Sequence, residues 1–213
     1  MEIVIAAAIL ALFAAVISPL VYRHLEESKI TAAQAETSTI GEALQHFHAD
    51  TGVWPVFIGG AQYGRLGSLA TGGCGGGGGG IPSGDGVVPT SDSWSSFGSI
   101  YSLVDLLVYN RANNAGADLF APSAVPMRTP GWHGPYMNDI HGDPWGSPYV
   151  CNITWGAYRE GQPGYRNDEE HNILVVSAGP NGVFETPFGD ATSVVGEEIG
   201  GDDIGFVVRL ARP

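Results

Sequence analysis

The chain has 213 residues and carries 9 Lys and Arg against 22 Asp and Glu, a formal net charge of −13 at pH 7. Nine cationic side chains are too few to form the basic stripe that binds a phosphate backbone. We therefore exclude nucleic acid as a partner. Thirty-two glycines and 14 prolines beside 15% charged residues indicate a loop-rich head that contains β-structure.

The first segment, residues 1–24, begins with the acid Glu2 and continues as an uncharged apolar run over 3–22 that contains Pro19. Twenty such residues rise about 30 Å as a helix, enough to cross the hydrocarbon core of a bilayer. A signal peptide would begin with positive charge and have a shorter apolar core, whereas here Arg23 follows the run. Because a carboxylate in hydrocarbon is costly, we expect Glu2 to have a specific cationic partner.

Segment 25–52 continues the helix in amphipathic form, because apolar residues recur at spacings of three and four. This stripe consists of Ile30, Ala33, Thr37, Ile40, Leu44 and Phe47. Gly52 is placed to cap the helix end, and Pro55 follows shortly after it. The sequence therefore predicts one helix of about 50 residues, about 75 Å long, with a kink or local opening at Pro19.

Segment 53–130 is expected to be an irregular, glycine-rich insertion with one short helix over 99–110. Segment 131–213 is expected to form a β-sheet head. Its strands are predicted over 150–155, 172–177 and 204–210, and an acidic loop precedes the last of them. Three antiparallel strands over the amphipathic half of the helix would bury its stripe, so the predicted fold class is α+β.

The two cysteines, Cys74 and Cys151, match no metal-binding spacing. In an extracytoplasmic head a disulfide between them is the natural expectation, and two free buried thiols are the alternative. A metal site is expected instead in the acidic loop before the last strand, because calcium takes six to eight oxygen ligands. The loop's candidates are Asn181, Glu185, Asp190, Glu197, Glu198, Asp202 and Asp203, and a solvated acidic loop is the alternative.

Aromatic residues gather in the head, at Trp132, Tyr136, Trp145, Tyr149 and Trp155. They could cradle a sugar, but the adjacent Pro and Gly residues favour turns and core packing. The chain lacks the H-E-x-x-H, G-x-S-x-G and P-loop patterns, and we do not expect an enzyme.

The run Glu-Ile-Val-Ile-Ala-Ala-Ala-Ile-Leu from Glu2, with Pro19 downstream, resembles the N-terminal segment of type IV pilins and type II secretion pseudopilins. In that family the acid and the proline both stand about three positions later, so we expect about three residues ahead of Met1 in the mature protein. Four further signatures follow in the family's order. They are Asp50 to Pro55, the Gly-Pro-Tyr of 131–136, the Asp-Pro-Trp-Gly of 143–149, and the C-terminal loop pieces 177–182 and 201–204.

The resemblance implies a pilin-like fold, in which a long N-terminal helix packs against a small antiparallel sheet with a C-terminal loop. It implies a filament subunit, methylated at its N-terminus, that resides in the bacterial inner membrane before assembly and in a periplasmic or cell-surface filament afterwards. Its partners would be other copies of itself, an assembly platform, a prepilin peptidase and minor pilins. Glu2 and Pro19 would serve assembly, and Asn181, Asp202 and Asp203 would bind calcium. The alternative is a membrane-anchored carbohydrate-binding or enzymatic head that uses the helix only as a tether.

Overall fold

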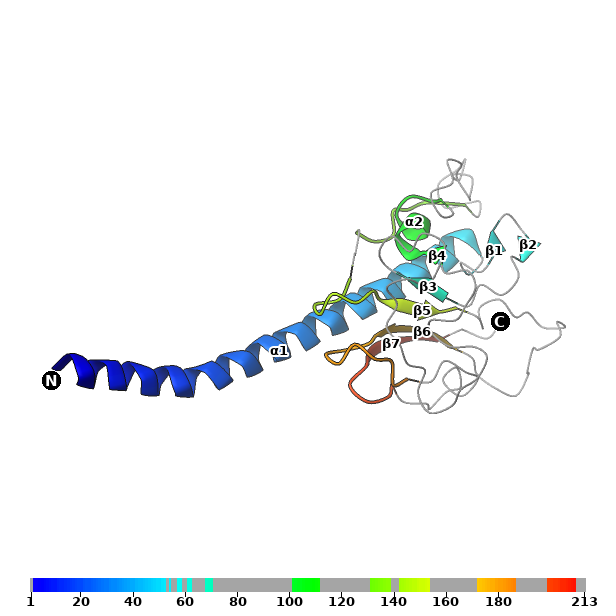
Figure 1. Ribbon diagram of the computed structural model, residues 1–213. Helices are drawn as coiled ribbons and strands as arrows, with labels where there is room; N and C mark the ends of the chain where they lie inside the picture. The colour runs from blue at the N-terminus through cyan, green and yellow to red at the C-terminus, as the bar shows by residue number, and fades with distance from the viewer. Residues whose placement is uncertain are drawn as a thin grey trace.

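A long helix projects from a head in which a sheet lies against the helix's second half (Figure 1). The computed structural model describes residues 2–52, 54, 57–58, 61–62, 68–70, 101–111, 131–138, 142–153, 172–186 and 199–209. In these ranges the chain contains the long helix α1, a short helix α2 and seven strands, β1 to β7. The arrangement is α+β, as the hydrophobic patterns predict.

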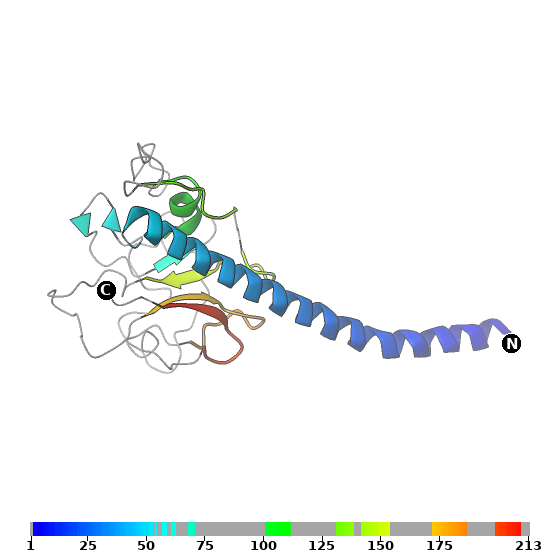
Figure 2. The ribbon, with the colours of Figure 1, turned by 180° about the vertical axis from the view of Figure 1, so that it is seen from behind.

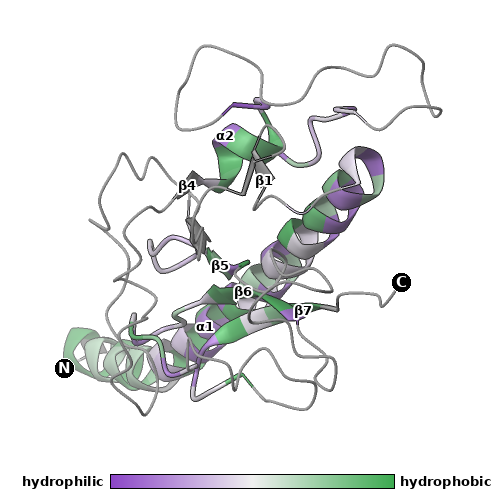
Figure 3. Ribbon diagram, turned by 90° about the vertical axis from the view of Figure 1, so that its right-hand side faces the viewer, coloured by the Kyte–Doolittle hydropathy of each residue, from purple (hydrophilic) through white to green (hydrophobic). Residues whose placement is uncertain are grey.

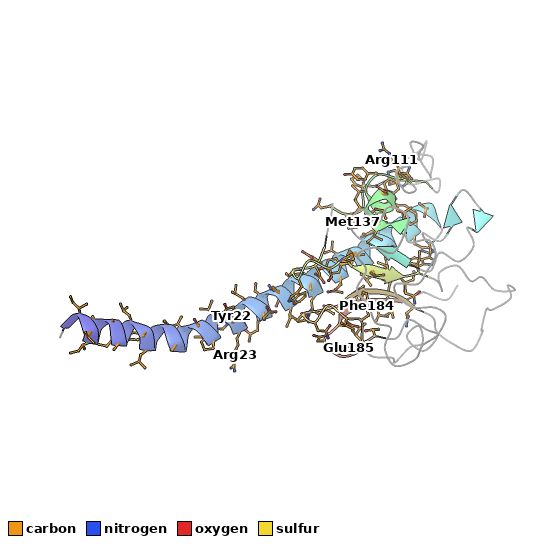
Figure 4. The ribbon with its side chains drawn as sticks, viewed as in Figure 1. Tyr22, Arg23, Arg111, Met137, Phe184 and Glu185 are labelled. Atoms are coloured by element: carbon orange, nitrogen blue, oxygen red, sulfur yellow. The ribbon has the colours of Figure 1, made fainter. Side chains whose placement is uncertain are left out.

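Helix α1 spans Glu2–Thr51, which confirms the prediction of a single helix. It continues through Pro19 and bends gently in the region of Tyr22 (Figure 4), where proline has removed one intrahelical donor. Gly52 follows the last helical residue with φ 71°, and its N–H donates to the carbonyl of His48 at 2.8 Å. The predicted glycine cap is therefore confirmed, because this left-handed conformation is one that glycine adopts without strain.

The two halves of α1 have different surroundings. In the second half most of the predicted stripe is buried: Ala33, Thr37, Ile40, Leu44 and Phe47 are each at most 1% exposed, while Ile30 is partly buried. In the first half the apolar side chains are exposed, and the helix lies clear of the head (Figures 1 and 2). Figure 3 shows hydrophobic residues at the N-terminal end of α1 and mixed colours nearer the head. One helix therefore serves two environments, as the change in pattern near Arg23 predicts.

The sheet contains the three predicted antiparallel strands, β5 (Val150–Asn152), β6 (Asn172–Ser177) and β7 (Ile204–Arg209). Two further strands extend it to the order β4-β3-β5-β6-β7. These are β3 (Ser68–Ala70), antiparallel to β5, and β4 (Tyr101–Ser102), parallel to β3. The expectation that segment 53–130 is irregular apart from one helix is thus corrected. Two- and three-residue strands in this segment are too short to give an alternating pattern.

Segment 53–130 also contains a hairpin of β1 (Phe57–Ile58) and β2 (Ala61–Gln62). Helix α2 spans Leu103–Leu107, and the Ser102 hydroxyl caps it by accepting from the N–H of Asp105 at 3.1 Å. It is shorter than the predicted helix over 99–110, because Tyr101 and Ser102 pair with β3 before the helix begins.

Strand β6 is buried on both faces. Ile173 and Val175 point into a core with the α1 stripe, α2 and Tyr149. Leu174 and Val176 point the other way and pack with Phe184, whose loop covers the outer face of the sheet. Figure 4 shows Phe184 and Glu185 beside the sheet, on the loop that follows β6. Burial on both sides explains why β6 is a continuous apolar run rather than an alternating one.

Candidate functional site

The largest unpartnered surface of the described chain is the first half of α1. Twelve large apolar side chains are at least 48% exposed there; these are Ile3, Val4, Ile5, Ile9, Leu10, Leu12, Phe13, Ile17, Leu20, Val21, Tyr22 and Leu25. By length and composition this helix could cross a membrane, a property it shares with signal sequences. Glu2 begins the helix, and its side chain lies outside the described part of the structure. Pro19 lies on the exposed half.

The loop 142–149 contacts α1 just beyond this exposed half, and Asp143 organises the loop. The buried Asp143 carboxylate accepts from the N–H groups of Trp145 at 3.1 Å and Ser147 at 2.8 Å through Oδ1. Its Oδ2 accepts from the Ser177 hydroxyl at 2.6 Å, at the end of β6. These charge-assisted hydrogen bonds fix the loop on the sheet.

Two side chains of the same loop contact α1. The Trp145 indole N–H donates to the Glu26 carboxylate at 3.1 Å, and the buried Tyr149 hydroxyl donates to Glu36. Burial and the Glu36 carboxylate raise the pKa of Tyr149 far above its usual value, so the phenol remains protonated as a donor. The Asp-Pro-Trp-Gly pattern predicts a turn here, but it does not predict these two contacts. Trp145 and Glu26 are 119 residues apart, and no local pattern connects them.

The C-terminal loop brings together the two flanks on which the metal prediction rests. The N–H of Asp202 donates to the Glu185 carboxylate at 2.8 Å, and the N–H of Gly200 donates to the Thr186 hydroxyl at 3.0 Å. At Gly201, with φ 55°, an added Cβ would lie 1.2 Å from Glu185 Oε2. At Gly200 an added Cβ would lie 2.6 Å from the carbonyl oxygen of Glu185, so glycine at this position allows the two flanks to approach closely.

Asp203 lies inside this loop and is 9% exposed. Its Oδ2 accepts from the N–H groups of Glu185 at 2.9 Å and Thr186 at 2.6 Å. Its Oδ1 is buried and has no hydrogen-bond partner among the residues that the structure describes. Burial raises the pKa of this carboxyl, and hydrogen bonds from Thr186 and Glu185 partly oppose the shift. A buried carboxylate oxygen without a partner is an atom that a cation would satisfy.

The other two predicted ligands differ from Asp203, because Asn181 and Asp202 are both exposed. Asn181 Oδ1 accepts from the N–H of Val183 at 2.7 Å, an Asx turn that leaves its second lone pair for another donor or a cation. Within the described ranges no group of three or more His, Cys, Asp and Glu side chains is arranged to hold a metal. Asp190, Glu197 and Glu198 lie outside the described residues.

Cys151 is a free, fully buried thiol in the described part of the chain. Its side chain lies in the core between the sheet and α1, and burial raises the pKa of the thiol well above its usual value. The disulfide with Cys74 and its alternative, two free buried thiols, both stay predictions, because only one of the two cysteines is described. Cys74 lies outside the described residues.

Two members of the aromatic group in the head, Trp132 and Tyr136, are partly buried and pack against the core. Phe47, Trp132 and Tyr136 meet edge to face, with ring centroids 4.8 to 6.3 Å apart. This is the arrangement that aromatic rings prefer when they pack against one another. These three rings give no flat platform of parallel rings, so packing against the core is the better interpretation of Trp132 and Tyr136. Trp155 lies outside the described residues.

Comparison of this chain with protein-family models, with characterised proteins and with solved structures found no match. The coarse class that the structure defines is therefore an α+β head carried on a long helix with an exposed apolar half.

Proposed function

We propose that this chain is a structural subunit of an extracytoplasmic helical filament, either type IV pilus-like or a type II secretion pseudopilus. The observation that carries the proposal is the exposed apolar half of α1, which is continuous with a half that packs beneath the head. Fully burying one large apolar side chain is favourable by about 1.5–3 kcal/mol. Twelve of them on one projecting helix form a strong driving force for association, first with lipid and then with other copies.

Assembly would place copies of α1 side by side in the core of the filament. Glu2 would then pair with the α-amino group at the start of a neighbouring chain. In apolar surroundings this pair neutralises two charges that are each costly alone, so it sets the axial register between copies. The motif resemblance to type IV pilins and pseudopilins supports this role for Glu2.

The C-terminal loop would bind calcium and thereby order this part of the head. The unpartnered Oδ1 of Asp203 supports this, and so does the contact between the two flanks of the loop. Asn181, Asp202 and Asp203 would supply oxygen ligands, and Glu185 lies against the same flank. Calcium would neutralise carboxylates that otherwise repel one another.

The same proposal assigns the chain's partners and location. It would enter the inner membrane through 3–22, be processed by a prepilin peptidase and be extracted by an assembly platform together with minor pilins. The competing function, a tethered carbohydrate-binding or enzymatic head, would need an open aromatic or catalytic surface. The edge-to-face packing of Trp132 and Tyr136 does not favour it.

The decisive experiment replaces the acid of the apolar segment. In Glu2→Ala we expect normal membrane insertion but a loss of filaments in electron micrographs of sheared cell-surface or periplasmic material. Glu27→Ala is the matched control, because Glu27 is exposed and lies beyond the apolar run, so it should polymerise as the wild type does. Normal filament yield from Glu2→Ala would contradict the assembly role, and absence of filaments from the wild type would favour the tethered head.

A further inference from the structure

The loop 142–149 presents Trp145 as a fixed feature of the head. Asp143 accepts two backbone N–H groups of the loop, and its own N–H donates to the carbonyl of Ser147 at 2.7 Å. The same carboxylate is bonded to Ser177 of the sheet. Because the loop is tied to itself and to β6, the position of Trp145 is set by the head and not by a free rotation of the loop.

Trp145 lies against the first turn of α1 beyond its exposed half, which ends at Leu25. Its indole donates to Glu26 at 3.1 Å, and Lys29 Nζ lies 3.3 Å from the other oxygen of Glu26 and 5.9 Å from the ring centroid. The indole hydrogen bond is the main cause of the lowered pKa of Glu26, which keeps this carboxylate ionised. The Lys29 ammonium and the Glu26 carboxylate pair with each other beside the indole.

The height of Trp145 above the apolar segment follows from helix geometry. The apolar run ends at Tyr22, and Glu26 is four residues further on, a rise of about 6 Å. The headgroup layer on each side of a bilayer is about 5–7 Å thick. Figures 1 and 2 show the loop 142–149 at the edge of the head nearest the N-terminal half of α1. When 3–22 spans the hydrocarbon core, Trp145 therefore lies level with the headgroups.

We infer that Trp145 is a membrane-surface contact of the head, seated in the phospholipid headgroup layer of the subunit before assembly. The residues of α1 at this level suit the place: Tyr22 is 70% exposed at the end of the apolar run, and the cationic Arg23 follows it. Tryptophan and tyrosine rings with a polar edge concentrate at membrane interfaces, where long cationic side chains reach the headgroups. The inference requires only that α1 spans a bilayer, so it is independent of polymerisation.

The test uses the full chain in phosphatidylcholine nanodiscs that hold one copy each, which removes neighbouring subunits as a source of contact. Tryptophan emission is measured with a nitroxide on the lipid headgroup and with a nitroxide deep in the acyl chain. The part of the emission that is lost in Trp145→Phe comes from Trp145. This part should be quenched strongly by the headgroup nitroxide and weakly by the nitroxide deep in the acyl chain. The matched control is Trp54→Phe, because Trp54 stacks on His48 about 33 Å along α1 from Glu26 and should leave the quenching unchanged.

A second measurement does not depend on any substitution. Wild-type chain in the same nanodiscs is irradiated with a phospholipid that carries a photoreactive headgroup, and the cross-linked peptides are identified by mass spectrometry. Cross-links to 142–149 support the contact. Equal quenching of wild type and Trp145→Phe, or cross-links confined to the helix, would overturn it. Quenching of Trp145 emission that appears only in discs with several copies would assign the surface to a second subunit and also overturn it.

Discussion

Asp203 is the residue at which burial and charge conflict most clearly. One carboxylate oxygen accepts two N–H groups, while the other is buried without a partner in the described part of the chain. Its pKa is raised in the fold, so the protonated form is favoured there. Its contribution to stability is thus fully present below the unfolded pKa and is lost as the pH rises through the higher folded pKa. A cation bound at this carboxylate would favour its ionised form and offset that loss.

This predicts that Asp203→Asn changes stability in opposite directions with and without calcium. Asparagine keeps an acceptor for Glu185 and Thr186, so in chelator at neutral pH the variant should melt no lower than the wild type. Calcium should stabilise the wild type by about 2.7 kcal/mol at a hundredfold excess over Kd and leave the variant unchanged. Melting temperatures of the full chain in detergent measure both effects.

The calcium experiment has two controls. One is magnesium in place of calcium, and the other is the variant Glu42→Gln, which changes an exposed residue of α1. Magnesium should stabilise poorly, because it demands tight octahedral geometry and retains its waters. Glu42→Gln should respond to calcium as the wild type does. Identical midpoints for the wild type in calcium, magnesium and chelator would show that the loop is only solvated.

The reactivity of Cys151 is a second property decided at the scale of one residue. Because the thiol is fully buried and its pKa is raised, an alkylating reagent should not modify it in the native protein. After denaturation without reductant the Cys151 peptide should be fully labelled, as mass spectrometry can show. Labelling that requires prior reduction would instead establish the disulfide with Cys74 and overturn the free thiol.

At the scale of elements, the close approach of α1 and β7 depends on Gly41. A Cβ at this position would lie 2.2 Å from Phe206 Cδ1 and 3.2 Å from Val208 Cγ2. Glycine inside a helix normally costs about 1 kcal/mol relative to alanine. Here it is retained because the sheet could not otherwise pack on the helix at this distance.

Gly41→Ala should therefore destabilise the head by about 1–3 kcal/mol in spite of the better helix propensity. In a Phe206→Ala background the nearest obstacle is gone, and Gly41→Ala should become neutral or stabilising by up to about 1 kcal/mol. Denaturant unfolding of the four proteins gives the coupling energy between the two positions. A stabilising effect of Gly41→Ala in the wild-type background would show that Phe206 moves aside freely.

At the scale of the whole molecule, the exposed apolar surface is concentrated in the first half of α1, and the head has little of it. Of the large apolar side chains described as exposed, only Tyr109 and Val183 lie outside the range from Ile3 to Leu25. Removing residues 1–25 should therefore give a monomeric head that stays in solution without detergent, with the core stripe and the Trp145–Glu26 hydrogen bond retained. Sedimentation of the truncated and full-length chains in detergent-free buffer measures this. Association of the truncated head would reveal a second interface on the head.

Much of the architecture could be read from local patterns. The period of the apolar residues predicted α1 and its buried stripe, glycine after Thr51 predicted its end, and three apolar runs predicted β5, β6 and β7. Each of these is decided by residues within a few positions of one another, through helix geometry, backbone conformation and side-chain alternation. The same reasoning placed the acids of the C-terminal loop on two flanks that the structure brings together.

Only the tertiary structure decided which distant groups meet. The addition of β3 to β5, the parallel pairing of β3 with β4 and the burial of Cys151 depend on chain segments that approach after long loops close. So do the bond from Asp143 to Ser177 and the bond from Trp145 to Glu26, which fix the head on its helix. A residue type shows which bonds it can make, but its partner is selected by the free energy of packing the whole chain. That selection leaves no periodic trace in the sequence.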